Sequence, residues 1–228
     1  MMVDNVEAVD EDGDVVLIIG PHEKRLKVAS ATLSKASSVF KALFGPYFRE
    51  GQAKRTSTKP AEISLPDDDP WAMVWICAQL HMVKATDEGS SAVYSPFILK
   101  LALLVDKYDL VGVLRLQVQA VLLRWILDSR KSCTIEAASN IIAASYLSHQ
   151  ARAFQMITIV FVERRFSNPS QLLQQQSGKL YPTSVLLALE ERKACGYIPQ
   201  KGLCLHCARD GADISTPCTK HALFNAFY

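Results

Sequence analysis

The sequence lacks the features of a membrane or secreted protein. No uninterrupted apolar run approaches the ~18 residues that span a bilayer, and the richest one, ILKLALLVDKYDL, is broken by Lys100, Asp106 and Lys107. The acidic first segment, residues 1–12, has neither the basic nor the apolar region of a secretory signal and is predicted to be a disordered tail. We therefore expect a soluble intracellular protein, nuclear or cytoplasmic, that has no membrane partner.

Catalytic and phosphate-binding patterns are also absent. The chain contains no G-x-S-x-G, GxGxxG or Walker motif, so we expect no enzymatic activity. The run Asp67–Asp69 precedes Pro70 at the start of a predicted helix, where acidic side chains interact favourably with the helix dipole, and we interpret it as a cap rather than a metal site. A formal charge of +2 is too small for general attraction to nucleic acid.

The chain is long enough for one good core or two modest ones, since it has 228 residues, 49% of them hydrophobic. Val15–Ile19 is a continuous β-branched and apolar run that predicts a buried strand. Leu26 and Val28 alternate with basic residues and predict a half-exposed strand, so that the two strands form a hairpin. Ile63 and Leu65 mark a short third strand.

Apolar residues at helical spacing predict that much of the remaining chain is helical. Ser30 is a good N-cap for a single helix over residues 30–44. Residues 51–60 are expected to form a loop, residues 171–182 a linker, and residues 183–194 a late helix. The core-facing side chains expected in the first two helices are Leu33, Ala36, Phe40, Leu43 and Phe44, then Trp71, Val74, Trp75, Ala78 and Met82.

Four segments between Gly13 and Asp128 follow one another in an uncommon order: GDVVLIIG, LKVASATLSKASSVFKALFGPYFREGQ, EISLPDDDPWAMVWICAQLH and LKLALLVDKYDLVGVLR. In this order they resemble a BTB/POZ domain of the type common in filamentous fungi. The resemblance is specific because several separate motifs occur in the family's order, among them the S-x-x-F helix and the DKYD helix.

The resemblance implies an α+β fold in which a small sheet is surrounded by helices and serves protein–protein association, often as a homodimer. Two positions depart from well-known members. Ala29 stands where animal members often have His, and Ser30 stands where members that recruit corepressors have a basic residue opposite the acid that Asp14 matches. Asp14 is therefore interpreted either as a strand-start carboxylate that accepts backbone N–H groups or as a charge at a dimer interface.

These patterns predict four parts along the chain. They are a disordered acidic tail over residues 1–12, a BTB/POZ-like domain over 13–128, an all-α extension over 129–195 and a short Cys/His tail over 196–228. The helical extension occupies the place of a BACK region in members of the family, and it is similar to that region in position and helicity.

The Cys/His tail carries the candidate metal ligands. Six cysteines in a chain without an export signal favour reduced thiols or a metal site over disulfides. Cys204 and Cys207 are separated by two residues, ten residues follow, and Cys218 and His221 repeat the two-residue gap. Two such turns can supply all four ligands of a tetrahedral structural zinc, with no position open for catalysis. His206 is an alternative ligand, and free thiols in a loosely ordered tail are the other interpretation.

The predicted function is a protein–protein interaction module that dimerises or docks a protein partner, with an adaptor role for a cullin-type ubiquitin ligase as one form of it. The alternative is a transcription-associated regulator whose Cys/His tail contacts nucleic acid. Lys201, Arg209 and Lys220 are the basic residues that such a contact would use.

Overall fold

The computed structural model describes most of the chain, and its elements divide into two compact units. The described residues are 6–52, 54–83, 94–129, 132–163, 171–194, 202–214, 218 and 221. Unit 1 comprises residues 1–93 and 103–114, and unit 2 comprises residues 94–102 and 115–228. The predicted boundary at 128–129 does not coincide with this division. The reason is that the helix before it belongs to unit 2, where the Gln150 side chain donates a hydrogen bond to the Arg115 carbonyl at 3.0 Å.

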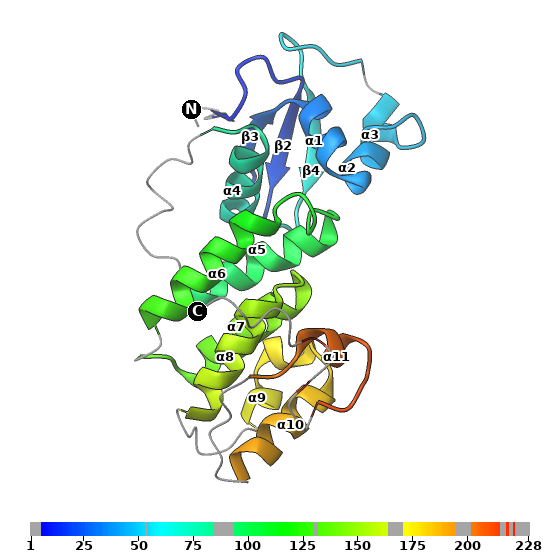
Figure 1. Cartoon of the computed structure of the whole chain (residues 1–228). Coiled ribbons are helices and arrows are strands. Elements are labelled where there is room, and N and C mark those ends of the chain that lie inside the picture. The colour runs from blue at the N-terminus through cyan, green and yellow to red at the C-terminus, as the bar shows by residue number, and fades with distance from the viewer. Residues whose placement is uncertain are drawn as a thin grey trace. The chain divides into compact units, whose positions relative to one another are not determined.

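Unit 1 is built on a four-stranded mixed sheet (Figure 1). Its strands are β1 (Glu7–Ala8), β2 (Val15–Ile19), β3 (Lys24–Val28) and β4 (Ala61–Leu65), in the order β1-β3-β2-β4. The predicted hairpin is confirmed, because β2 and β3 are antiparallel with Leu17 opposite Leu26. The predicted third strand is also confirmed: β4 runs parallel to β2 and places Ile63 beside Leu17. The α+β fold class predicted from the sequence is thus the one observed.

The acidic first segment departs from the prediction of a disordered tail where it is described, from residue 6 onward. The short strand β1 pairs in parallel with β3, and the Val9 amide donates to the Lys27 carbonyl at 3.0 Å. The Glu7 carboxylate lies 2.6 Å from Lys24 Nζ. Lys24 at the start of β3 and the β3 backbone therefore give the acidic segment partners that its composition alone does not reveal.

The helix predicted over residues 30–44 is two helices, α1 (Ser30–Ala36) and α2 (Ser38–Leu43). Ser37 between them is extended, accepts a hydrogen bond from the Phe40 amide at 3.0 Å and donates one to the distant Tyr108 carbonyl at 2.6 Å. Ala29, rather than Ser30, is the N-cap of α1. Phe40 is fully buried as predicted, and its ring stacks on that of Tyr108 with centroids 4.3 Å apart.

Two further helices of unit 1 follow, α3 (Arg49–Gln52) and α4 (Pro70–Leu80). The predicted cap of α4 is confirmed, because Asp69 Oδ1 accepts a hydrogen bond from the Ala72 amide at 3.0 Å. The predicted core face of this region is partly wrong: Trp71 is 53% exposed and Met82 is 93% exposed. Helix α4 is apolar on every side, so the spacing of apolar residues cannot identify its buried face. The side chains that α4 buries are Ala72, Met73, Val74, Ile76, Cys77 and Ala78.

Unit 2 is helical throughout its described elements. After α5 (Ser95–Lys107), which contributes residues to both units, come α6 (Arg115–Ser129), α7 (Ile135–Leu147), α8 (Ala151–Glu163), α9 (Gln171–Gln174), the 3-10 helix η2 (Gln176–Lys179), α10 (Thr183–Ala194) and α11 (Leu205–Arg209). Helix α7 lies at the centre, because every residue from 138 to 145 is buried. In the part of the chain that the structure describes, no helix combines the length and the apolar character that a bilayer crossing requires.

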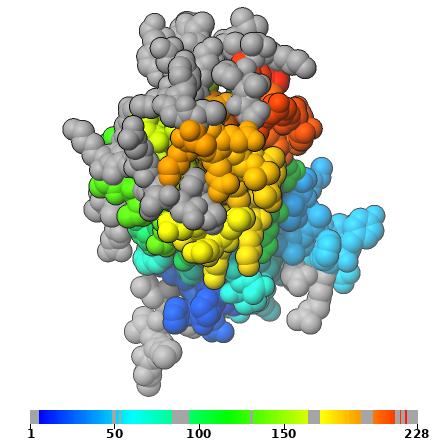
Figure 2. Space-filling view, turned by 90° about the horizontal axis from the view of Figure 1, so that it is seen from below, coloured from blue at the N-terminus to red at the C-terminus, as the bar shows by residue number. Residues whose placement is uncertain are grey.

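The segment 171–182, predicted to be a linker, contains two short helices that belong to unit 2. Its helices α9 and η2 pack on α7, where the Ser177 hydroxyl donates to the buried Ser139 hydroxyl at 2.7 Å and Leu172 is fully buried. Figure 2 shows α9 (yellow) and α10 (orange) side by side at the surface. The late helix has the predicted bounds, Thr183–Ala194.

Candidate metal centre

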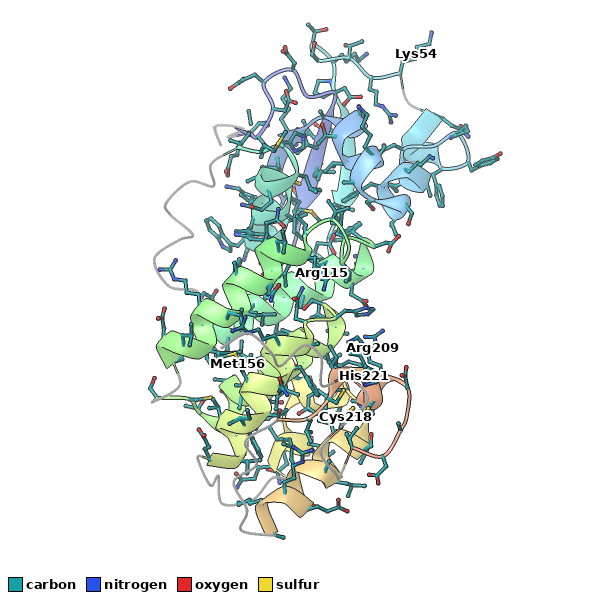
Figure 3. All side chains as sticks on the ribbon, in the orientation of Figure 1. Lys54, Arg115, Met156, Arg209, Cys218 and His221 are labelled. Carbon is teal, nitrogen blue, oxygen red and sulfur yellow. The ribbon has the colours of Figure 1, made fainter. Side chains whose placement is uncertain are left out.

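The structure brings the four predicted metal ligands together. The sulfur atoms of Cys204, Cys207 and Cys218 and Nδ1 of His221 all lie within 4.8 Å of one another. His221 Nδ1 is 3.5 Å from the Cys204 sulfur, 3.6 Å from the Cys207 sulfur and 3.3 Å from the Cys218 sulfur. The sulfur atoms of Cys207 and Cys218 are 3.5 Å apart. Figure 3 shows Cys218 and His221 close together beside Arg209.

These separations fit one tetrahedrally coordinated ion. With Zn–S distances of ~2.3 Å and Zn–N distances of ~2.0–2.1 Å, tetrahedral geometry places two sulfur ligands ~3.8 Å apart and a sulfur and a nitrogen ligand ~3.5 Å apart. The observed separations of 3.3–3.6 Å agree with these values to within a few tenths of an ångström. The widest separation in the cluster is 4.8 Å, so the four side chains can hold one metal ion after shifts of about 1 Å, and all four ligands come from protein, as in structural sites.

Helix α11 positions the first two ligands. Cys204 is its N-cap and Cys207 lies three residues later, so both side chains project from the same side of the first turn. Gly211 follows the helix with a φ of +67°, a left-handed conformation that glycine adopts without strain. The Ala212 amide then donates to the Cys207 carbonyl at 3.0 Å, which closes the turn directly behind a ligand.

The segment that carries α11 is packed into unit 2. The interpretation of a loosely ordered tail is therefore wrong for residues 202–214. Gly202 lies so close to α8 that an added Cβ would be 1.9 Å from the Gln155 carbonyl oxygen. The Leu203 amide donates to the Thr158 hydroxyl at 2.9 Å. The buried side chains of this segment include Leu203, Leu205, Ala208 and Ile214. Residues 202–214 are therefore part of the helical core of unit 2 rather than a separate module.

Two arginines connect the same segment to other helices of unit 2. Arg209 Nη1 donates to the Tyr146 carbonyl at 3.0 Å, and its guanidinium lies 5.2 Å from the centre of the Tyr146 ring. Arg192, buried on α10, donates to the Ile214 carbonyl at 3.3 Å. Of the basic residues predicted to contact nucleic acid, Arg209 thus has partners within the chain, while Lys201 and Lys220 lie outside the described residues.

The ionisation of the thiols differs across the cluster. Burial, followed by contacts with the Cys218 and Cys204 thiols, raises the pKa of Cys207 to about 12. A backbone hydrogen bond at His221 is the main cause that lowers the pKa of Cys218 to about 6. Because a metal binds thiolates, loading the site requires that Cys207 in particular release a proton.

His206, the predicted alternative ligand, is not one of the clustered groups. Its side chain is exposed, and its ring centroid is 5.1 Å from that of His221. Two other described cysteines, Cys77 and Cys133, are buried elsewhere, and burial raises the pKa of Cys77 to about 12. These two thiols are therefore core residues rather than ligands.

Asp14 in unit 1 matches the first of its two interpretations. Its carboxylate accepts hydrogen bonds from the Ser30 amide and the Ser30 hydroxyl, both at 2.7 Å. Arg55 Nε, from the loop before β4, lies 3.2 Å from the same carboxylate. A base therefore does face Asp14, but it comes from residue 55 and not from position 30. Burial acts to raise the pKa of Asp14, yet the Ser30 hydrogen bonds and the Arg55 charge hold it below its ordinary value.

Sequence reasoning missed the role of Asp68. The cap interpretation of Asp67–Asp69 holds for Asp69, but Asp68 is only 3% exposed and lies under the DKYD segment. Its carboxylate accepts hydrogen bonds from Lys107 Nζ at 2.6 Å and from the Tyr108 hydroxyl. No local signal distinguishes Asp68 from its neighbours, because its partners are about 40 residues away.

Comparison of the sequence with protein-family models and with curated proteins gives no match. The function is therefore inferred from the fold and the site geometry of this chain.

Proposed function

We propose that this chain is a non-enzymatic protein–protein association module, in which a BTB/POZ-like unit 1 dimerises or docks another protein. The observation that carries this proposal is the element order of unit 1. A hairpin, two short helices, a strand parallel to the first hairpin strand and a capped helix follow one another. The sequence segments that resemble a BTB/POZ domain lie in residues 13–128, which include these elements, and a cullin ubiquitin ligase is the specific partner class that the resemblance suggests.

Exposed apolar side chains on unit 1 support an association role. Tyr47 is 92% exposed and Phe48 is 49% exposed in the turn between α2 and α3, and Val39 on α2 is 38% exposed. Trp71 at the start of α4 is 53% exposed. Single exposed apolar residues are ordinary, but adjacent aromatic side chains in one turn are typical of a surface that another protein covers.

We propose further that Cys204, Cys207, Cys218 and His221 hold a structural Zn²⁺. Three thiolates and an imidazole are soft and borderline ligands that suit zinc, and they leave no coordination position for substrate or water. Bound zinc would join residues 218 and 221 to α11, which is itself fastened to α8 and α10. The site would then stabilise unit 2 and have no catalytic role.

Affinity purification tests the docking role. The tagged chain is used to capture proteins from a cell extract, with a direct pull-down of purified cullin as the specific arm. A Tyr47→Ser/Phe48→Ser variant should lose the captured partner. Leu187→Ser, which replaces a 55% exposed apolar residue on α10 of unit 2, should retain it. Equal capture by both variants would show that the α2–α3 turn is not the docking surface.

Metal analysis tests the zinc proposal. The chain purified without chelator should contain about one zinc ion per molecule, since the four ligands form one closed site. Cys207→Ser should lose most of the metal, and Cys133→Ser should keep it, because Cys133 is buried outside the cluster. Zinc far below one equivalent in the wild-type chain would contradict the proposal.

A further inference from the structure

The metal cluster contains a thiol pair that is already close to disulfide distance. The sulfur atoms of Cys207 and Cys218 are 3.5 Å apart, and a disulfide bond is ~2.05 Å long, so the two sulfurs need to approach by about 1.5 Å. Cys207 is 8% exposed, whereas Cys218 is only half-buried. Solvent can therefore reach Cys218 more easily than Cys207, which is buried next to it.

The third thiol, Cys204, lies within 4.8 Å of the other two, and the Cys207–Cys218 separation of 3.5 Å is well inside that limit. Cys204 and Cys207 both belong to the first turn of α11, and the Ala208 amide donates to the Cys204 carbonyl at 3.0 Å. A Cys204–Cys207 disulfide is therefore the competing product, because C-x-x-C pairs at the start of a helix form such bonds. Cys218 lies outside any helix, so it can move toward Cys207 while α11 stays anchored through Leu203 and Arg209.

We propose that Cys218 and Cys207 are a thiol pair that hydrogen peroxide oxidises to a disulfide. Cys218 is oxidised first to a sulfenic acid, and Cys207 then attacks its sulfur to form the disulfide. The bound zinc is released when the disulfide forms. The zinc-release step rests on the proposed zinc site and makes zinc binding there dependent on thiol oxidation. The disulfide step rests only on the positions of the two sulfur atoms.

The reaction balances with hydrogen peroxide as the oxidant. The Cys218 thiolate attacks one peroxide oxygen, the O–O bond breaks, and the hydroxide that leaves takes a solvent proton to become water. The Cys207 thiolate then attacks the Cys218 sulfenic sulfur, and the S–O bond breaks as a second hydroxide leaves and is protonated. Peroxide accepts two electrons and the two thiolates lose them. Cys204 and His221 remain as the only protein ligands, so the ion dissociates.

The test treats the zinc-loaded full chain with hydrogen peroxide. Zinc release is followed with a chromogenic chelator, and disulfides are located by mass spectrometry of unreduced peptides. We expect one zinc ion released for each disulfide formed, a linked peptide pair containing Cys207 and Cys218, and reversal by dithiothreitol with added zinc. Cys133→Ser should behave like the wild-type chain.

The metal-free chain separates the two parts of the inference. If the purified chain holds no zinc, the zinc site fails, and a Cys207–Cys218 disulfide in the peroxide-treated metal-free chain still supports the thiol pair. Cys218→Ser in the metal-free form should lose this disulfide. A disulfide mapped to Cys204 and Cys207, oxidation that stops at sulfinic acid, or retention of zinc and thiols under peroxide would each overturn the proposal.

Discussion

Replacing Tyr108 by phenylalanine tests the buried carboxylate of unit 1. The Tyr108 hydroxyl donates to Asp68, whose side chain is nearly inaccessible to water. Burial and the Asp68 carboxylate raise the pKa of Tyr108, so the phenol stays protonated and remains a donor. The second partner of Asp68 is Lys107, whose side chain is 50% exposed and shares its charge with solvent. Loss of the hydroxyl therefore leaves the carboxylate without the buried donor that Tyr108 supplies.

The magnitude follows from this arrangement. Hydrogen bonds to charged groups contribute about 1.5–3 kcal/mol, while the phenylalanine ring keeps the stacking contact with Phe40. Tyr108→Phe should thus lower the unfolding free energy of unit 1 by about 1.5–3 kcal/mol. Because the two units need not unfold together, urea unfolding is followed by hydrogen exchange of unit 1 peptides. Tyr47→Phe is the control, since Tyr47 is 92% exposed. Equal stability of the Tyr108→Phe variant and the wild-type chain would refute the reasoning.

Three further predictions concern other contacts. The pKa of Asp14 is lowered in the folded chain. The stability that ionised Asp14 contributes is therefore present above pH ~4 and is lost as the pH falls through the folded pKa. In urea titrations at a series of pH values, Asp14→Asn should reduce the loss of stability at acid pH. Met73→Ala should destabilise unit 1 by about 2–5 kcal/mol in urea unfolding. Trp71→Ala should destabilise it far less, because of the two side chains only Met73 is fully buried. Equal losses of stability would contradict the observed buried face of α4. Zinc chelation should speed hydrogen exchange in residues 202–214 and leave the sheet of unit 1 unchanged.

Local signals in the sequence identified those elements whose determinants are also local. The apolar run of β2, the alternation along β3 and the Asp69-Pro70 start of α4 each lie within a few residues of the structure they specify. The metal centre was predictable for the same reason, because its four ligands fall within 18 positions and their spacing follows the geometry of two short turns.

The errors arose where a distant partner decides the outcome. Ser37 interrupts the predicted helix because its hydroxyl reaches the Tyr108 carbonyl, 71 residues away. Asp68 is buried because Lys107 and Tyr108 cover it, and Arg55 rather than position 30 supplies the base beside Asp14. These pairings come from tertiary packing, and single-sequence periodicity carries no information about them.

The association role is tested most directly by the mass of the purified chain in light scattering over a range of concentrations, with cullin present and absent. We predict a species of about twice the 25.3 kDa chain mass, or a stable complex with cullin, that the Tyr47→Ser/Phe48→Ser variant no longer forms. A mass of one chain at every concentration, unchanged by cullin, would contradict the proposed function.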